Sequence, residues 1–224
     1  MAELTIKQHI KSIIPDTLLL GQLVLRRARA WRNAGLVFVH VPKNGGTSIN
    51  SAVYGQFMGH YRVCDIERFR PDLIRTLPSL AVTRNPWARA YSAWKFARRG
   101  ASMGDGAQIY HAERYQGRDF ASFERFIMEW LPSRELERED NVFRPQSQYL
   151  LNRAGAIGVS HLGAIENPST YLPFLEEALG RKVDIGRLNS TSDPNRFRKS
   201  YTSEMRDMLA SCYADDIERF NYDF

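Results

Sequence analysis

Short apolar runs alternate along this chain with segments whose apolar residues recur at helical spacing. The runs at 36–41 and 80–83, and a further candidate at 156–165, are too short for typical helices. Such β-branched runs are typical of buried parallel strands. Strands alternating with helices predict an α/β fold, a parallel sheet covered by helices on both faces. Ligands of such sheets bind at the carboxyl ends of the strands.

The helical segments have recognisable boundaries. We expect one from Asp119, whose aromatic residues follow helical spacing as core positions do, and a 65–75 helix divided at Pro71. A short strand should follow the turn at 55–61, and the glycine-rich stretch 100–117 should be a mobile loop beside the ligand site. The other expected helices cover 6–31, 86–99, 168–179, which Gly180 ends, and 203–220.

The first strand leads into a candidate anion site. Pro42 cannot donate to a sheet ladder and should end the strand, and the glycine pair 45–46 permits a tight turn. Thr47 or Ser48 is then expected to cap a helix. Backbone N–H groups and the positive end of the helix dipole would converge there, as in sites for phosphate-like groups.

The order of residues in this loop differs from that of nucleotide-hydrolysing P-loop proteins. Their motif places a lysine directly before the serine or threonine, whereas Gly46 stands there in this chain and Lys43 comes first. The lysine should therefore approach an anion from the strand side. Taken alone, the loop is equally compatible with a plain strand–helix turn carrying a solvated lysine.

A second strand–helix junction adds another cation. Arg84 follows the strand at 80–83, Asn85 can cap a helix, and Pro86 suits its first position. Ser92 lies about 9 Å further along the helix axis. Arg84 and Ser92 could thus hold one anion between them. The alternative is a salt bridge at the strand end and a hydroxyl on the helix surface.

The two junctions together resemble the sulfotransferases. Residues 40–48, HVPKNGGTS, are similar to the 5′-phosphosulfate loop of that family, and residues 84–92, RNPWARAYS, to its 3′-phosphate motif. The resemblance is strongest to the Golgi-type carbohydrate sulfotransferases and their bacterial relatives, and further likeness lies at 143–146, 165–167 and 189–220. Asn44 departs from the more common threonine, and Val142 and Phe143 stand where a histidine and a tryptophan are common.

The resemblance implies a P-loop-like sulfotransferase fold and the co-substrate 3′-phosphoadenosine 5′-phosphosulfate (PAPS), with no metal. Lys43 would stabilise the leaving phosphate, and Arg84 and Ser92 would bind the 3′-phosphate. The acceptor would be a hydroxyl on a glycan or another small molecule. The residues expected to bind the co-substrate are Lys43, Asn44, Gly45, Gly46, Thr47, Ser48, Arg84 and Ser92.

A histidine is the expected base, because its ordinary pKa suits proton abstraction near neutral pH. We favour His60, which lies between the two motifs where relatives carry a histidine; a hydrogen-bonded structural role is the alternative, and His111 is the other candidate base. We also expect Arg89 to face the ligand or an acidic neighbour. Arg144 and Gln146 are expected to line the acceptor cleft, and Ser190 and Thr191 to contact the nucleotide.

The composition of the chain bears on the number of domains, the class of ligand and the use of the cysteines. The chain of 224 residues, 43% hydrophobic, predicts one domain over 1–224 with a helical extension, 1–34, packed on it. Its net charge of +6 suits polyanionic ligands, but no basic–aromatic motif favours nucleic acid. Cys64 and Cys212 are too few and too distant for a zinc site or a disulfide framework.

Location and activity are expectations of the same kind. No segment reaches the roughly 20 apolar residues of a membrane span, so we expect a cytoplasmic, bacterial-type enzyme or an excised domain. Contact of the N-terminal helix with a membrane surface is less favoured than packing on the domain. The alternatives to a sulfotransferase are a P-loop-like small-molecule kinase and a non-catalytic module that binds nucleotides or sulfated glycans.

Overall fold

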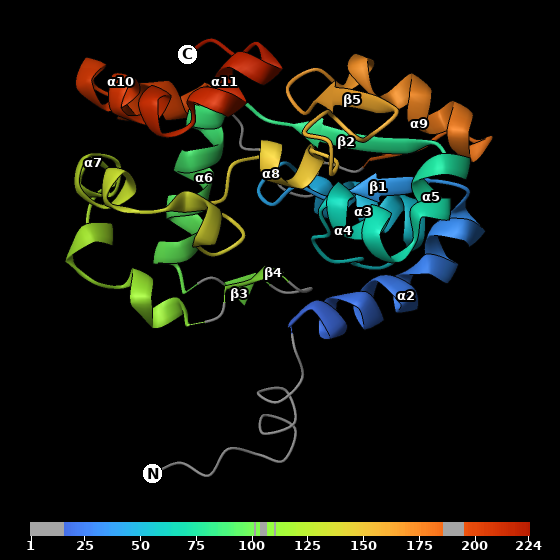
Figure 1. Ribbon diagram of the computed structural model, residues 1–224. Helices are drawn as coiled ribbons and strands as arrows, with labels where there is room; N and C mark the ends of the chain where they lie inside the picture. The colour runs from blue at the N-terminus through green and yellow to red at the C-terminus, as the bar shows by residue number, and fades with distance from the viewer. Residues whose placement is uncertain (1–15, 101, 104–106, 110, 186–194) are drawn as a thin grey trace.

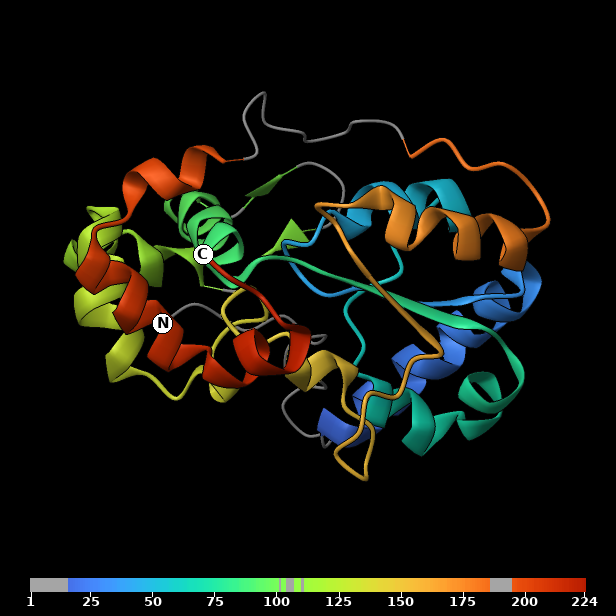
Figure 2. The same ribbon diagram turned by 90° about the horizontal axis from the view of Figure 1, so that it is seen from above.

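Two packed halves make up the described part of the chain (Figure 1). The computed structural model describes residues 16–100, 102–103, 107–109, 111–185 and 195–224. One half contains the parallel sheet, and the other is built from helices around α6 (Pro86–Arg98). The strand β2 (Ser79–Thr83) leads almost directly into α6, so the chain crosses between the halves at the second predicted motif (Figure 2).

The sheet confirms an α/β architecture with parallel strands. Its order is β1 (Val37–Val39), β2 and β5 (His161–Ala164), and both neighbouring pairs run parallel. The register places Phe38 opposite Leu80 and Ala81 opposite Leu162. All residues of β1 and β2 are buried, as expected of strands covered on both faces.

Alternate residues of the strands serve two different cores, because successive side chains of a strand point to opposite faces. Val37, Val39 and Ala81 belong to one core and Phe38, Leu80 and Val82 to the other. The first core is completed by α2 (Asp16–Ala34), α4 (Val63–Phe69), α5 (Pro71–Thr76) and α8 (Ser147–Leu150). The second is completed by α3 (Gly46–Tyr54) and α9 (Leu172–Leu179).

Aromatic side chains fill the core of the helical half. Phe120, Phe126, Trp130 and Phe143 pack with ring centroids 4.8–5.8 Å apart, which confirms that the aromatics after Asp119 are core residues. This core is enclosed by α6, α7 (Phe123–Arg125), α10 (Ser203–Cys212) and α11 (Ala214–Phe220). The last two lie beside α6 in both views (Figures 1 and 2).

Several local predictions hold. The helix expected at 65–75 is divided into α4 and α5, with Pro71 opening the second. Asn85 caps α6 by accepting hydrogen bonds from the backbone N–H groups of Trp87 and Ala88. Gly180, in the left-handed conformation, ends α9. The stretch 100–117 differs from the loop expected there, because β3 (Ser102–Met103) and β4 (Ala107–Gln108) pair antiparallel and a 3-10 turn covers Ala112–Tyr115.

Other boundaries were predicted wrongly. No strand follows residues 55–61 in the described chain. The helix expected from Asp119 begins only after Ser122, whose hydroxyl accepts the N–H of Arg125, and it continues as a π-helical turn, Phe126–Trp130. The expected helix 203–220 is broken at Tyr213, whose hydroxyl donates to the carbonyl of Phe143.

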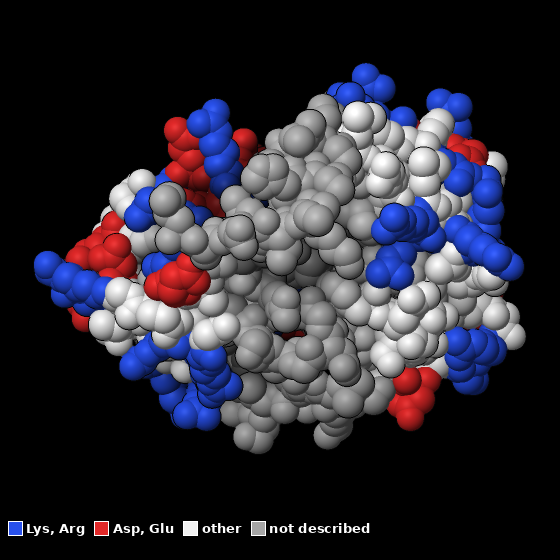
Figure 3. All heavy atoms as spheres, turned by 90° about the horizontal axis from the view of Figure 1, so that it is seen from below, with Lys and Arg blue, Asp and Glu red and all other residues white. Residues whose placement is uncertain are grey.

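Only part of the predicted N-terminal extension falls within the described residues. There α2 packs its Val24, Ala28 and Trp31 into the sheet core, while Leu18 and Leu25 are exposed. No helix of the described chain is long and apolar enough to cross a membrane. Figure 3 shows the molecule from below, and α2 lies on this lower side in Figure 1. Lys and Arg side chains are spread over the right-hand half of that view, and acidic side chains lie only near its margin. Membrane contact stays a prediction.

Candidate functional site

The ends of β1 and β2 bring the two predicted motifs together. These strands are parallel neighbours, so their carboxyl ends open on the same edge of the sheet. Residues 40–45 follow β1, and Arg84 follows β2. The two motifs, which are distant in the sequence, therefore lie close together in the structure.

The loop after β1 has left-handed backbone at two positions. Gly45, the residue that precedes α3, has φ 72° and Lys43 has φ 69°. The cap predicted at Thr47 or Ser48 is wrong, because α3 already begins at Gly46 and no side chain caps it. The hydroxyls of Thr47 and Ser48 instead lie in the first helical turn, half-buried.

Two arginines from the second motif hold the strained backbone of this loop. Left-handed geometry costs a residue with a side chain about 1–2 kcal/mol, so Lys43 requires support from its surroundings. Arg84 Nη1 donates to the carbonyl of Lys43 at 2.9 Å, and Arg89 Nε donates to the carbonyl of Pro42 at 3.1 Å. Arg89, predicted to face the ligand or an acidic neighbour, donates to this carbonyl, and its charge also acts on the buried Asp216, where it opposes the rise in pKa that burial causes.

Lys43, Arg84 and Arg89 form a cation cluster without a counter-ion at salt-bridge distance within the described residues. Lys43 Nζ lies 4.0 Å from the centroid of the Phe96 ring. Burial lowers the pKa of Lys43 to about 8, with help from the charges of Arg84 and Arg89. Arg89 is only 2% exposed, and its Nη2 has no partner in the described chain.

Such a cluster is suited to an anion. Buried charges are costly unless they are paired, and a like charge nearby disfavours the protonated form of a lysine. An anion bound among these three side chains would offset both effects. The arrangement therefore favours a polyanionic ligand at the edge of the sheet.

A buried amide connects the two motifs. Gln146 Oε1 accepts from Asn44 Nδ2 at 2.7 Å and from the backbone N–H of Arg84 at 2.9 Å, while its Nε2 donates to the carbonyl of Arg84 at 2.8 Å. Asn44 Nδ2 also donates to the carbonyl of Val82. Gln146 is 0% exposed. Its predicted place in an acceptor cleft is therefore wrong, because its amide is used to join the two loops.

His60 lies against the strand end that precedes Lys43. Its Nδ1–H donates to the carbonyl of His40 at 2.9 Å, which leaves the lone pair on Nε2 free to accept a proton. Burial lowers the pKa of His60 to about 4, and the charges of Arg89 and Lys43 contribute. Because the charges of Arg89 and Lys43 act on the pKa of His60, this histidine lies near the cation cluster.

His40 has a structural position beside this histidine. Its ring centroid lies 4.3 Å from that of His60, and its Nδ1 accepts from Asn50 Nδ2 at 2.8 Å. Burial holds the pKa of His40 well below its ordinary value. A Cβ added to Gly46 would meet the His40 ring at 2.1 Å. Gly46 is thus required by side-chain packing, whereas the left-handed turn favours glycine at Gly45.

The predicted 3′-phosphate pair is only partly assembled. Ser92 is half-buried on α6, and its hydroxyl has no hydrogen-bond partner in the described chain. No hydrogen bond joins it to Arg84 there. The junction itself is fixed from the turn after β5, because Glu166 Oε1 accepts the N–H of Asn85 at 2.8 Å. Asn85 Nδ2 also donates to the carbonyl of Asp223.

The remaining candidates lie apart from the cluster or outside the described residues. His111 is exposed and pairs with Glu113 at 3.1 Å. Arg144 Nε donates to the carbonyl of Glu139. Ser190 and Thr191 lie outside the described residues. Sequence reasoning missed the amide bridge, although the departure of Asn44 from threonine was its one visible signal.

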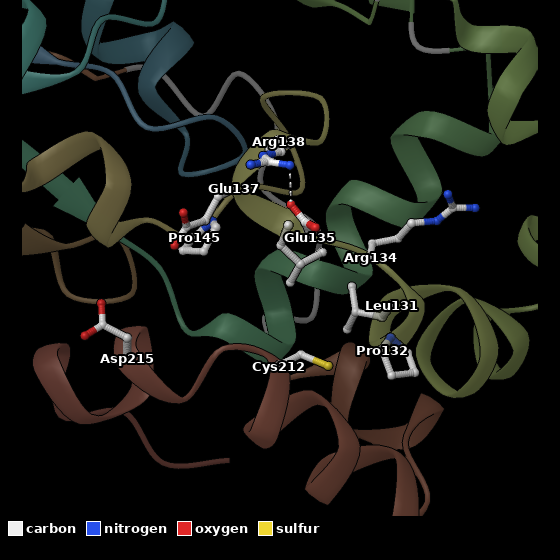
Figure 4. Close-up of a pocket in the computed structure, with 10 residues that line it drawn as sticks. Leu131, Pro132, Arg134, Glu135, Glu137, Arg138, Pro145, Cys212 and Asp215 are labelled. Carbon is white, nitrogen blue, oxygen red and sulfur yellow. Dashed lines mark ion pairs between the residues drawn. The ribbon is translucent and has the colours of Figure 1, made fainter.

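A cavity of about 520 Å³ opens elsewhere, beside α10 (Figure 4). It contains the ion pair between Arg138 and Glu135, 2.8 Å apart. None of the predicted site residues lines this cavity. The charged side chains that do line it are of both signs: Arg134, Glu135, Glu137, Arg138 and Asp215. This mixed lining does not suit a strongly anionic ligand.

Comparisons with known proteins give no family for the chain. Neither the protein-family models nor the curated proteins match it. Within the described residues, no group of three or more His, Cys, Asp or Glu side chains could hold a metal ion. The geometry of the site and the resemblance of the two motifs are therefore the grounds for assigning a function.

Proposed function

We propose that the protein is a sulfotransferase that moves the sulfuryl group of PAPS to an acceptor hydroxyl on a carbohydrate. The observation that carries this proposal is the cation cluster of Lys43, Arg84 and Arg89. It stands at the joined ends of two neighbouring parallel strands and has no salt-bridge partner in the described chain. The similarity of both surrounding motifs to sulfotransferase motifs adds support.

The residues have separate roles in the proposed reaction. Lys43 and the N–H groups at the start of α3 would stabilise the charge that develops on the bridging oxygen of the leaving phosphate. Asn44, Gly45, Gly46, Thr47 and Ser48 form the loop around it. Arg84 and Ser92 would bind the 3′-phosphate, whose dianion suits a guanidinium fork.

His60 would act as the base. Its free Nε2 would take the proton of the acceptor hydroxyl as the acceptor oxygen forms a bond to sulfur. The bond between sulfur and the bridging phosphate oxygen breaks at the same time, and adenosine 3′,5′-bisphosphate leaves. The in-line arrangement of the two oxygens would come from holding the donor at both of its ends.

The test is transfer of label from PAPS carrying ³⁵S to a panel of glycans and small hydroxyl compounds. We expect a labelled acceptor and stoichiometric adenosine 3′,5′-bisphosphate. Binding of the donor without transfer to any acceptor would instead support a non-catalytic module. Transfer of phosphate from ATP, with no transfer from PAPS, would support the kinase alternative and contradict the proposal.

A further inference from the structure

The amide of Gln146 holds both halves of the candidate site at once. Its oxygen accepts one hydrogen bond from Asn44, in the lysine loop, and one from the backbone of Arg84. Its nitrogen donates to the carbonyl of the same arginine. A side chain amide is planar and offers one acceptor oxygen and two N–H donors, so these contacts fix the two loops relative to a single rigid group.

The backbone of Gln146 is anchored independently of its side chain. Asp216, in α11, is 1% exposed and accepts the N–H groups of Gln146 and Ser147 at 2.7 and 2.8 Å. A substitution that shortens the side chain leaves these backbone hydrogen bonds available. The contribution of the amide bridge can therefore be separated from that of the C-terminal helix.

Asn44 gives the bridge a feature that a threonine would lack. The two N–H groups of its amide serve two acceptors, the carbonyl of Val82 and Gln146 Oε1, at 2.8 and 2.7 Å. A threonine hydroxyl has one donor hydrogen and could serve only one of them. The asparagine thus ties the lysine loop both to β2 and to Gln146.

A fixed separation matters most to a ligand that is charged at both ends. A site that is already organised avoids the cost of ordering two loops during binding. A ligand with one phosphate needs only one of the loops. We propose that Gln146 is a specificity-determining positioning residue, which makes the site prefer nucleosides phosphorylated at both the 3′ and 5′ positions over 5′-monophosphates. This inference rests on the proposed function.

Calorimetric titration of the full chain with adenosine 3′,5′-bisphosphate and with 5′-AMP tests the inference. The quantity of interest is the ratio of the two dissociation constants. In Gln146→Ala we expect the preference for the bisphosphate to fall by at least about tenfold, as loss of coupling between two sites predicts. Affinity for 5′-AMP should change less than about threefold. General destabilisation would weaken both ligands alike and leave the ratio unchanged.

Gln148→Ala is the matched control. Gln148 lies in α8, two residues after Gln146, and its amide donates only to the carbonyl of Glu137, at 3.2 Å, so its loss should leave the ratio unchanged. An unchanged ratio in Gln146→Ala, with the wild-type chain binding the bisphosphate, overturns the role of Gln146 alone. Failure of the wild-type chain to bind the bisphosphate overturns the proposed function as well.

A milder variant keeps the test decisive if Gln146→Ala does not fold. Asn44→Thr leaves Gln146 in place and removes one of the two donors of residue 44. We expect the preference for the bisphosphate to fall in this variant too, by less than in Gln146→Ala. An unchanged preference in folded Asn44→Thr contradicts the inference.

Discussion

At the scale of single residues, Lys43 combines a left-handed backbone with a lowered side-chain pKa. Its left-handed φ of 69° is supported by the hydrogen bond that Arg84 donates to its carbonyl. Burial, together with the charges of Arg84 and Arg89, lowers the pKa of its ammonium group to about 8. Both features cost free energy in the unliganded protein. They are explained together if an anionic ligand completes the site.

Replacing Lys43 by methionine should therefore affect turnover more than binding. We expect the kcat of sulfuryl transfer to fall by about 10²–10³, the range for loss of one electrostatic stabiliser of a transition state. The affinity for adenosine 3′,5′-bisphosphate, measured by calorimetry, should fall much less. Lys95→Met on α6, whose ammonium lies over Tyr91, is the control. Equal losses in turnover and affinity would contradict a role at the leaving group.

The pH dependence of kcat/KM follows from two lowered pKa values. His60, with a pKa of about 4, is neutral and able to accept a proton above that pH. Lys43, with a pKa of about 8, keeps its charge below that pH. Because kcat/KM reports groups of the free enzyme, we expect a bell-shaped profile between about pH 4 and pH 8. An acid limb near the ordinary histidine pKa of 6.5 would argue against His60 as the base.

Among the helices, an end could be predicted from the sequence where residues next to it decide its position. The Asn85–Pro86 start of α6 and the Gly180 end of α9 were predictable, because capping is decided by neighbouring residues. The start of α3 was not. A serine or threonine is a good cap in isolation, but the loop ends at Gly45 and the helix begins at Gly46. Gly46 packs against the His40 ring, which leaves no room for a Cβ there.

Gly46→Ala tests that packing. The added methyl group would meet the His40 ring at 2.1 Å, and overpacking of this kind typically costs about 1–3 kcal/mol. The free energy of unfolding, measured with urea, should fall by that amount. Gly117→Ala is the control, since a Cβ there meets nothing within 4 Å. Equal stability of the two variants would refute the tight contact.

Arg84→Ala tests the junction between β2 and α6. Loss of a buried, hydrogen-bonded charge typically costs a complex 2–5 kcal/mol, so affinity for adenosine 3′,5′-bisphosphate should fall at least about 30-fold. Arg98→Ala, at the exposed end of the same helix, should bind normally. Unchanged affinity in Arg84→Ala would remove Arg84 from the 3′-phosphate site.

At the scale of the whole molecule, the sheet half was more predictable than the helical half. Short apolar runs ending in proline or arginine fixed the strands β1 and β2, and parallel order placed their ends together. The aromatic half resisted prediction because its π-helical turn at 126–130 and its break at Tyr213 arise from contacts between distant residues. The role of Gln146 was hidden for the same reason, since its partners lie 102 and 62 positions away.

The central claim is that one bisphosphorylated adenosine occupies both strand ends. Its most direct test is calorimetric titration of the full chain with adenosine 3′,5′-bisphosphate at pH 7, where Lys43 is charged and His60 neutral. We expect one binding event per chain, with higher affinity than for 5′-AMP. Absence of binding heat, at several temperatures and with a folded protein, would contradict it.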